Sequence, residues 1–245
     1  MNISAFCSKF DKSFPPKGRE KITRIFEYRF LRRLFDPCRS INGMSSIKKL
    51  KLLNLAYSFL EIDECYVEIG TFSGKSLISA MIKNNLRKTY ACDNFSEFND
   101  LSSESTLTSN LEQYNLKDKV VFFNSDFKRI LNHQNIEMPI GLYFYDGGHD
   151  YESHYLAVKL VENLLANEAL IIVDDWRFDR DSQSYAKFGT LKAIEESKHV
   201  YNLLYELPAR HNGDHAMWWN GIAVYAFYKD NNIQFIKHAQ KTPGF

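Results

Sequence analysis

The segment from Tyr66 to Ser76 restricts the possible folds of this chain more than any other part of its sequence. An apolar run ends at Ile69, a loop with Gly70 and Gly74 follows, and an apolar-periodic helix begins at once near Ser76. A strand, a glycine loop and a helix N-terminus in direct succession form the ligand-binding edge of an open α/β sheet, because free backbone N–H groups point out of that edge. The segment therefore predicts an α/β fold with a cofactor at this loop.

The spacing of the glycines indicates which cofactor fits. A dinucleotide fingerprint needs Gly-x-Gly-x-x-Gly so that the pyrophosphate can lie against the backbone, and Phe72 occupies its middle glycine position here. Glu68, at the strand end, would repel a diphosphate and attract an amino-acid ammonium. The loop therefore disfavours NAD and favours a cofactor with a zwitterionic tail. A plain strand–helix turn without a ligand is the alternative.

The length of the chain suits one α/β domain with additions, or two small domains. With 245 residues, 44% hydrophobic and 25% charged, the chain is typical of a soluble globular protein. We divide it into a basic helical extension (1–62), a main domain (63–230) and a tail (231–245). The net charge is +1, but residues 1–60 hold 13 Lys and Arg against 4 Asp and Glu. This basic segment suits an anionic substrate, a membrane surface or the acidic remainder, and a solvated face is the alternative.

The apolar pattern predicts strands alternating with helices. Residues 1–17 are expected to be irregular, and two helices, at 18–36 and 46–60, are expected to form a lid, a dimer contact or a substrate cap. The stretch 94–110 reads as a loop entering a helix that runs to about 114, and 177–190 as a loop before a helix to 198. A further helix is predicted at 151–166. The nearly apolar strands indicate a parallel sheet covered on both faces. After the first strand, the predicted strands are 89–93, 120–124, 140–145, 169–173, 201–207 and 221–228.

The cysteines and the apolar runs bear on the cellular compartment. Cys7, Cys38, Cys65 and Cys92 include no Cys-x-x-Cys pair, which favours free thiols in a reducing compartment. No apolar run reaches the ~18 residues of a membrane span. We therefore expect a cytoplasmic protein without a transmembrane segment.

Acidic residues follow several of the predicted strands. Asp93 lies about 20 residues past the glycine loop, where a carboxylate can accept hydrogen bonds from ribose hydroxyls. Ser125 and Asp126 end the third strand and can contact an adenine or cap the next helix. An exposed loop aspartate is the alternative for Asp93.

Three further carboxylates, Asp146, Asp174 and Asp175, follow neighbouring strands and should converge on one cleft. A hard divalent cation such as Mg²⁺ would relieve their repulsion. The alternative is one cofactor contact, with the other acids capping helices or pairing with arginines. His149 lies three residues past Asp146, where a neutral imidazole can accept a proton from a substrate hydroxyl; a surface histidine is the alternative.

The motifs in this order resemble a known enzyme family. The acid-x-Gly-x-x-x-Gly segment at Glu68 is similar to the first motif of class I S-adenosylmethionine-dependent methyltransferases. The segment from Asp146 to Glu152, followed one helix later by a strand ending in Asp-Asp, closely resembles the macrocin O-methyltransferase group and, more distantly, catechol O-methyltransferase. The resemblance covers about residues 64–228. It implies a Rossmann-like, seven-stranded, mostly parallel sheet whose last strand is antiparallel.

The resemblance also implies site residues. The catechol-type pattern places metal ligands at Asp146, Asp174 and Asp175, and a base three residues after the first ligand; that base is a lysine in the family and His149 here. The N-terminal helices and the segment before the last strand become candidates for the substrate pocket, although core aromatics and solvated histidines would explain its residues equally well. The predicted pocket residues are Trp176, His211, His215 and Trp218. The predicted cofactor contacts are Glu68, Gly70, Thr71, Phe72, Gly74, Ser76, Asp93, Ser125, Asp126 and Asp146.

The expected activity is methyl transfer from S-adenosylmethionine to a hydroxyl of a small molecule, such as a sugar or another hydroxylated metabolite. Mg²⁺ would bind the hydroxyl and His149 would remove its proton. A metal-independent N- or carboxyl-methyltransferase and a non-catalytic binding module are the alternatives. Nucleic acid is not an expected partner, because no stacking platform accompanies the basic residues. A homodimer through the N-terminal helices is compatible with the sequence.

Overall fold

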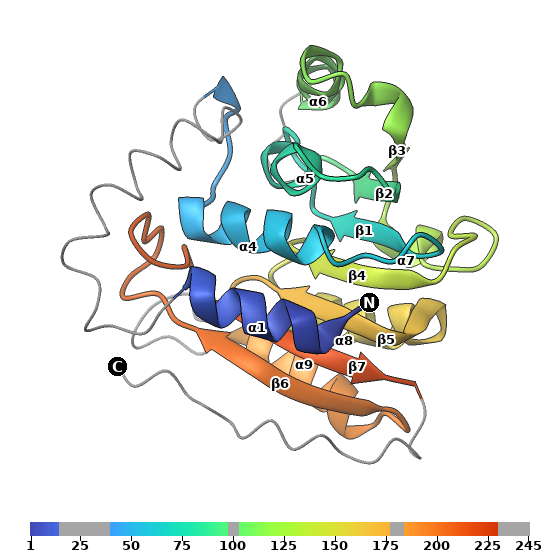
Figure 1. Ribbon diagram of the computed structural model, residues 1–245, viewed down its shortest axis with the longest axis vertical. Coiled ribbons are helices and arrows are strands. Elements are labelled where there is room, and N and C mark those ends of the chain that lie inside the picture. Colours follow the sequence, from blue (N-terminus) through green and yellow to red (C-terminus); the bar gives the residue numbers. More distant parts are fainter. Residues whose placement is uncertain (15–39, 98–102, 177–183, 230–245) are drawn as a thin grey trace.

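A single seven-stranded sheet organises the chain (Figure 1). The structure is a computed structural model that describes residues 1–14, 40–97, 103–176 and 184–229. The strand order is β3-β2-β1-β4-β5-β7-β6, in which β7 runs antiparallel to both of its neighbours and the other adjacent pairs are parallel. This confirms the predicted Rossmann-like sheet with an antiparallel last strand. The strands are β1 (Cys65–Ile69), β2 (Lys88–Asp93), β3 (Val120–Asn124), β4 (Ile140–Tyr145), β5 (Leu165–Val173), β6 (Val200–Leu207) and β7 (Ile222–Tyr228).

Helices cover both faces of the sheet, as Figure 1 shows for α1 and α4 in front and α8 and α9 behind. Alternate side chains of a strand enter different cores: Leu142 and Phe144 of β4 join the front cluster, and Tyr143 and Tyr145 the rear one. This alternation explains why the strands are apolar at nearly every position. The front helices are α1 (Ile3–Ser13), α4 (Ile47–Tyr57), α5 (Lys75–Met81) and α6 (Ser103–Gln113), and the rear helices are α7 (Phe127–Ile130), α8 (Tyr151–Val161) and α9 (Tyr185–Glu195). Short 3-10 helices are Lys117–Lys119 and Glu162–Leu164.

The N-terminal segment is helical, so the prediction of an irregular stretch over 1–17 was wrong. Ile3, Phe6, Cys7 and Phe10 recur at helical spacing and are all buried in α1. The side chain of Asn2 caps the helix by accepting a hydrogen bond from the backbone N–H three residues later. Residues of α1 and α4 share the front cluster with the sheet. The helix predicted at 18–36 lies outside the described residues.

Three element boundaries differ from the prediction. α8 ends at Val161, because β5 begins already at Leu165, which pairs with Ile140 of β4. α6 begins at Ser103 within the predicted loop, since Ser103, Leu107 and Leu111 bury one helical face. α9 begins at Tyr185, where the hydroxyl of the preceding serine caps the helix.

The described cysteines, Cys7, Cys65 and Cys92, are buried free thiols, as predicted, and Cys38 lies outside the described residues. Among the described helices, none combines the length and the apolar character that crossing a bilayer requires.

Candidate functional site

Backbone hydrogen bonds join the carboxyl ends of neighbouring strands into one edge. The N–H of Asp146, after β4, donates to the carbonyl of Ile69 at the end of β1 (2.9 Å). The N–H of Asp174, after β5, donates to the carbonyl of Tyr145 at the end of β4 (3.0 Å). The acidic residues that follow β4 and β5 therefore lie beside the glycine loop, as the sequence predicts.

The glycine loop has a shape that only glycine permits at two positions. Gly70 has φ +85°, and a Cβ atom there would lie 1.8 Å from the carbonyl oxygen of Asp146. Gly74 has φ +84°, caps α5, and would bring a Cβ to 2.7 Å from Leu107. Phe72, between them, also has a positive φ of 44°. The close backbone approach of Asp146 thus requires glycine at position 70, and the positive φ favours glycine at both positions, whatever the loop binds.

Asp93 ties the end of β2 to this loop. Its Oδ2 accepts a hydrogen bond from the N–H of Phe72 and its Oδ1 from the N–H of Phe95, both at 2.7 Å. Burial raises the pKa of the half-buried Asp93 carboxyl above its usual range. Each carboxylate oxygen has a second lone pair, so the side chain retains acceptor capacity for hydroxyl groups.

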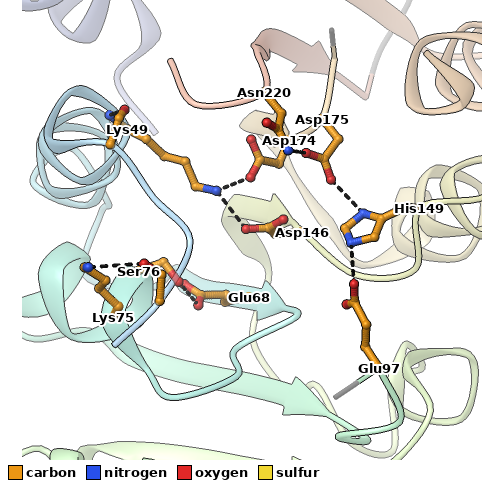
Figure 2. Close-up of polar contacts among 12 residues, drawn as sticks. Lys49, Glu68, Lys75, Ser76, Glu97, Asp146, His149, Asp174, Asp175 and Asn220 are labelled. Carbon is orange, nitrogen blue, oxygen red and sulfur yellow. Dashed lines mark hydrogen bonds and ion pairs between the residues drawn. The ribbon is translucent and has the colours of Figure 1, made fainter. Parts of the chain in front are cut away.

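Glu68 faces the interior of the protein. It is fully buried and accepts a hydrogen bond from the Tyr66 hydroxyl (2.5 Å). A second hydrogen bond, from the Ser76 hydroxyl (2.7 Å), ties β1 to α5 (Figure 2). Burial raises its pKa to about 7. Thr71 is also buried, and its hydroxyl is 3.5 Å from the carbonyl of Cys92. Direct cofactor contacts by Glu68, Thr71 and Ser76 stay predictions.

Ser125 and Asp126 lie at the end of β3, beside the end of β2. The N–H of Ser125 donates to the carbonyl of Asp93 (3.1 Å). The side chain of Asp126 caps α7 by accepting from the N–H of Lys128 at 2.9 Å. Asp126 therefore fulfils the helix-capping alternative, and an adenine contact stays a prediction for both residues.

A lysine that the sequence analysis did not single out lies between two of the carboxylates. The Nζ of Lys49, from α4, is 2.8 Å from Asp146 Oδ2 and also forms an ion pair with Asp174 Oδ2 (Figure 2). The Lys49 side chain is 1% exposed. Burial disfavours its charge, but the two carboxylates outweigh burial and raise the pKa of Lys49 above its usual range. The ammonium is therefore a fixed positive charge inside the site.

Burial acts against the charge of both carboxyl groups beside Lys49. Burial, reinforced by the neighbouring Asp146, raises the pKa of Asp174 well above its usual range. Burial also raises the pKa of Asp146, although Lys49 counteracts it. Lys49 therefore offsets part of the cost of burying two adjacent carboxyl groups.

His149 and Asp175 form a second pair at the same edge. The Nδ1 of His149 is 2.6 Å from Asp175 Oδ2, its Nε2 is 3.3 Å from Glu97 Oε1, and the side chain is 45% exposed (Figure 2). The other Asp175 oxygen accepts a hydrogen bond from the Asn220 amide at 2.8 Å. Hydrogen bonds to Asp175 and then Glu97 raise the pKa of His149 to about 11. Burial alone would raise the pKa of Asp175, but the hydrogen bond from His149 outweighs it and lowers that pKa.

The three predicted metal ligands do not fit a divalent cation in this arrangement. Asp146 and Asp174 bind Lys49, whereas Asp175 binds His149 and Asn220. Across the described ranges, no group of three or more His, Cys, Asp and Glu side chains has the arrangement of a metal site. The carboxylates converge as predicted, but Lys49 and His149 supply the positive charge that we expected from Mg²⁺.

Comparison with known proteins identifies the fold. Residues 67–176 match the model of a family described as a methyltransferase domain. An O-methyltransferase from Bacillus cereus, in complex with S-adenosylhomocysteine, is 18% identical with a TM-score of 0.56, covering 92% of this chain and 97% of that chain. The O-methyltransferase TomG from Streptomyces achromogenes, involved in tomaymycin synthesis and in complex with S-adenosylmethionine, is 17% identical with a TM-score of 0.56 and coverages of 94% and 100%. The fold is that of the Rossmann-like methyltransferases.

Other comparisons limit what the methyltransferase fold implies. An rRNA methylase from Streptococcus thermophilus is 11% identical with a TM-score of 0.51, covering 75% of this chain and 95% of that chain. A search of curated proteins found no match to the sequence. The family match and the fold together support a class I S-adenosylmethionine-dependent methyltransferase, and they do not distinguish the macrocin-like group within that class.

The four predicted pocket residues do not lie together, because the sheet lies between Trp176 and Trp218. Trp176 is buried in the rear cluster, where its Nε1 donates to Glu206 at 2.7 Å. Trp218 is buried in the front cluster beside α1. His211 and His215 are exposed on the connection before β7. A substrate contact stays a prediction for each, but the four side chains do not line one pocket.

The residues that the prediction missed reach the candidate site from distant segments. Lys49, Glu97 and Asn220 belong to no recognisable motif, and their partners are far away in the sequence. One signal was available for Lys49, because it shares a helical face with the fully buried Leu52 and Leu53 of α4. A lysine on an apolar face indicates a buried partner.

Proposed function

We propose that the protein transfers a methyl group from S-adenosylmethionine to a hydroxyl group of a small molecule. The observation that carries this proposal is the His149–Asp175 pair, which lies at the same sheet edge as the glycine loop and Asp93. All of these residues fall within the segment that matches the methyltransferase-domain family. An oriented histidine beside a cofactor edge suits a reaction in which an acceptor hydroxyl loses its proton.

The cofactor edge fits S-adenosylmethionine in charge and in hydrogen-bonding capacity. Asp93 offers a carboxylate to the ribose hydroxyls, and the Asp93 and Asp146 carboxylates suit a cofactor that carries positive charge. The spacing of Gly70 and Gly74 lacks the middle glycine that a pyrophosphate needs. When bound, S-adenosylmethionine supplies a methyl group that passes to the acceptor oxygen, while the electron pair of the broken bond stays on sulfur.

Within this proposal His149 receives the proton of the acceptor hydroxyl. Asp175 fixes the ring through Nδ1, so the proton goes to Nε2, which now faces Glu97. A histidine with a pKa of about 11 is an imidazolium at neutral pH and cannot act as a base. Before transfer, Glu97 must therefore move away and the Nε2 proton must leave to solvent, so that the neutral Nε2 can take the proton of the acceptor hydroxyl. Glu97 is 54% exposed, which allows such a displacement.

Positioning should contribute more to the rate than the base. Holding the two reactants in line can lower the activation barrier by up to ~7–11 kcal/mol. A general base increases the rate by about 10²–10⁴-fold, which corresponds to about 3–5 kcal/mol of the barrier. His149→Asn is thus expected to slow transfer by that factor without abolishing it. Metal assistance is not part of the proposal, because Lys49 lies between Asp146 and Asp174.

The test is a transfer assay with methyl-labelled S-adenosylmethionine and a panel of sugars, phenols and other hydroxylated metabolites, run in chelator. We expect label on an acceptor oxygen, with a loss of about 10²–10⁴-fold in His149→Asn. His133→Asn, a matched change at an exposed histidine in the connection before β4, should leave the rate unchanged. Label on nitrogen or on a carboxylate alone, or full activity of His149→Asn, would refute the proposal.

A further inference from the structure

Lys49 lies where a lysine is not expected. It belongs to the face of α4 that carries Leu52, Leu53 and Ala56, all fully buried, and its own side chain is 1% exposed. Removing an ammonium group from water costs several kcal/mol unless anionic partners compensate. The position of Lys49 is therefore explained by the groups around its Nζ, and the apolar stripe of its helix does not account for it.

The groups around that ammonium come from one edge of the sheet. Asp146 and Asp174, 97 and 125 residues away in the sequence, accept from Nζ, and the Phe144 ring centroid is 5.5 Å from it. The remaining carboxylate of the cluster, Asp175, is occupied by His149 and Asn220. Lys49 thus contacts two of the three acids that the sequence assigns to a metal ion.

Each acid of the cluster has a basic partner, so no metal ion is needed to separate them. Lys49 contacts Asp146 and Asp174, and His149 contacts Asp175. The pair beside Lys49 also has unused acceptor capacity, because the buried Asp174 Oδ1 has no hydrogen-bond partner among the described residues. Removal of the lysine would therefore leave two adjacent carboxylates with free oxygens and no counter-charge.

We propose that Lys49 is the resident cation of this site: it holds Asp146 and Asp174 in the place where a divalent metal ion was expected, and it masks a latent metal site. Because α4 supplies this cation, the segment before β1 builds the site as well as covering it. Lys49 acts as a positioning residue, since it fixes the carboxylates of the cleft. Only the kinetic part of this inference rests on the proposed methyl transfer.

The test measures Mn²⁺ binding to the full chain by electron paramagnetic resonance, where bound and free Mn²⁺ are distinguished directly. Wild-type protein should bind no stoichiometric Mn²⁺, whereas Lys49→Met should bind one ion per chain. The double variant Lys49→Met with Asp174→Asn should lose that ion. Lys48→Met makes the same change one residue earlier, where Nζ is 3.7 Å from Met217 Sδ, and should behave like the wild type.

A kinetic arm separates positioning from a purely structural role. In chelator, transfer by the wild type should be unaffected, and Lys49→Met should be slower on the order of 100-fold. Added Mn²⁺ should restore part of the Lys49→Met rate, and Lys48→Met should need no restoration. Rescue by a metal ion is not expected of a residue that only stabilises the fold.

Each outcome decides the inference. Stoichiometric Mn²⁺ binding by wild-type protein, abolished by Asp174→Asn, would overturn it, and this measurement stands even if Lys49→Met does not fold. A folded Lys49→Met that binds no Mn²⁺ would overturn it as well. S-adenosylhomocysteine binding, measured in the same samples, reports on the proposed function separately, because its absence leaves the Mn²⁺ results intact.

Discussion

Three residues at the carboxyl edge of the sheet have positive φ angles, which residues other than glycine rarely adopt. Phe72, Phe95 and Asp175 have φ values of 44°, 52° and 53°. Such conformations cost about 1–3 kcal/mol each and persist where the surroundings hold them. Asp93 binds the N–H groups of the two phenylalanines, and His149 and Asn220 hold the side chain of Asp175. The strained backbone therefore coincides with the polar groups that we assign to the cofactor and the acceptor.

Glu97→Gln should shift the pH dependence of methyl transfer. Glu97 helps to raise the pKa of His149, so removing its charge lowers that pKa. Because the base must be neutral, the rate should rise with pH through the pKa of His149, and this rise should move to lower pH by on the order of one unit. The measurement is the pH profile of kcat/KM. A profile unchanged from wild type would contradict the role of His149 as proton acceptor.

Gly70→Ala should destabilise the glycine loop. Its Cβ would lie 1.8 Å from the Asp146 carbonyl oxygen at a φ of +85°, so both a clash and a backbone strain arise. We expect a loss of about 2–4 kcal/mol in the free energy of unfolding, measured by urea titration. Gly213→Ala is the control, because its φ is +69° but its Cβ would meet only the Trp219 ring at 3.7 Å. Equal losses in the two variants would show that the close approach at Gly70 is unimportant.

At the residue level, the sequence predicted the positions of the acidic side chains that directly follow the parallel strands. Asp146, Asp174 and Asp175 could be expected to converge because parallel strands end at a common edge. Lys49 could not be paired with them from the sequence, since 97 and 125 residues separate it from Asp146 and Asp174. Its contact depends on how α4 packs on the sheet, and periodicity does not determine that packing.

At the level of elements, α1 belongs to the core. Phe10 is 3% exposed and its ring centroid is 3.9 Å from that of Tyr205 in β6, while Phe6 is fully buried beside it. Aromatic contacts of this kind add to the free energy of burial. The helix is therefore fixed to the sheet by packing, and its short length does not make it marginal.

Phe10→Ala should lower the free energy of unfolding by about 3–5 kcal/mol, because it removes a buried aromatic ring and leaves a cavity. The measurement is equilibrium unfolding in urea, followed by circular dichroism. Lys9→Ala, at an exposed position of the same helix, should change stability by less than about 0.5 kcal/mol. Similar values for the two variants would mean that α1 does not pack as described.

The strands were predictable and the first helix was not, for one physical reason. β1, β4 and β7 are buried at nearly every position, so their sequences are apolar except for Glu68 in β1. α1 alternates its four buried residues with polar ones over a single short segment. A short amphipathic helix carries little signal until a partner surface for its apolar face is known.

Across the whole molecule, the charge asymmetry of the sequence has a partly internal explanation. Residues 1–60 are strongly basic, and one of their lysines, Lys49, neutralises acids that follow β4 and β5. One of the alternatives for the basic segment was contact with the acidic remainder of the chain. Lys49 makes such a contact. The candidate site at this sheet edge therefore combines a segment before β1, the glycine loop and the acids that follow three strands.

A calorimetric titration with S-adenosylhomocysteine tests that conclusion most directly. Wild-type protein should bind in the micromolar range, and Asp93→Ala should bind about 10–100-fold more weakly, because it loses charged hydrogen bonds to the ribose. Asp118→Ala, an exposed change in the short helix before β3, should bind like the wild type. A folded wild-type protein that binds no S-adenosylhomocysteine would contradict the assignment of this edge as a cofactor site.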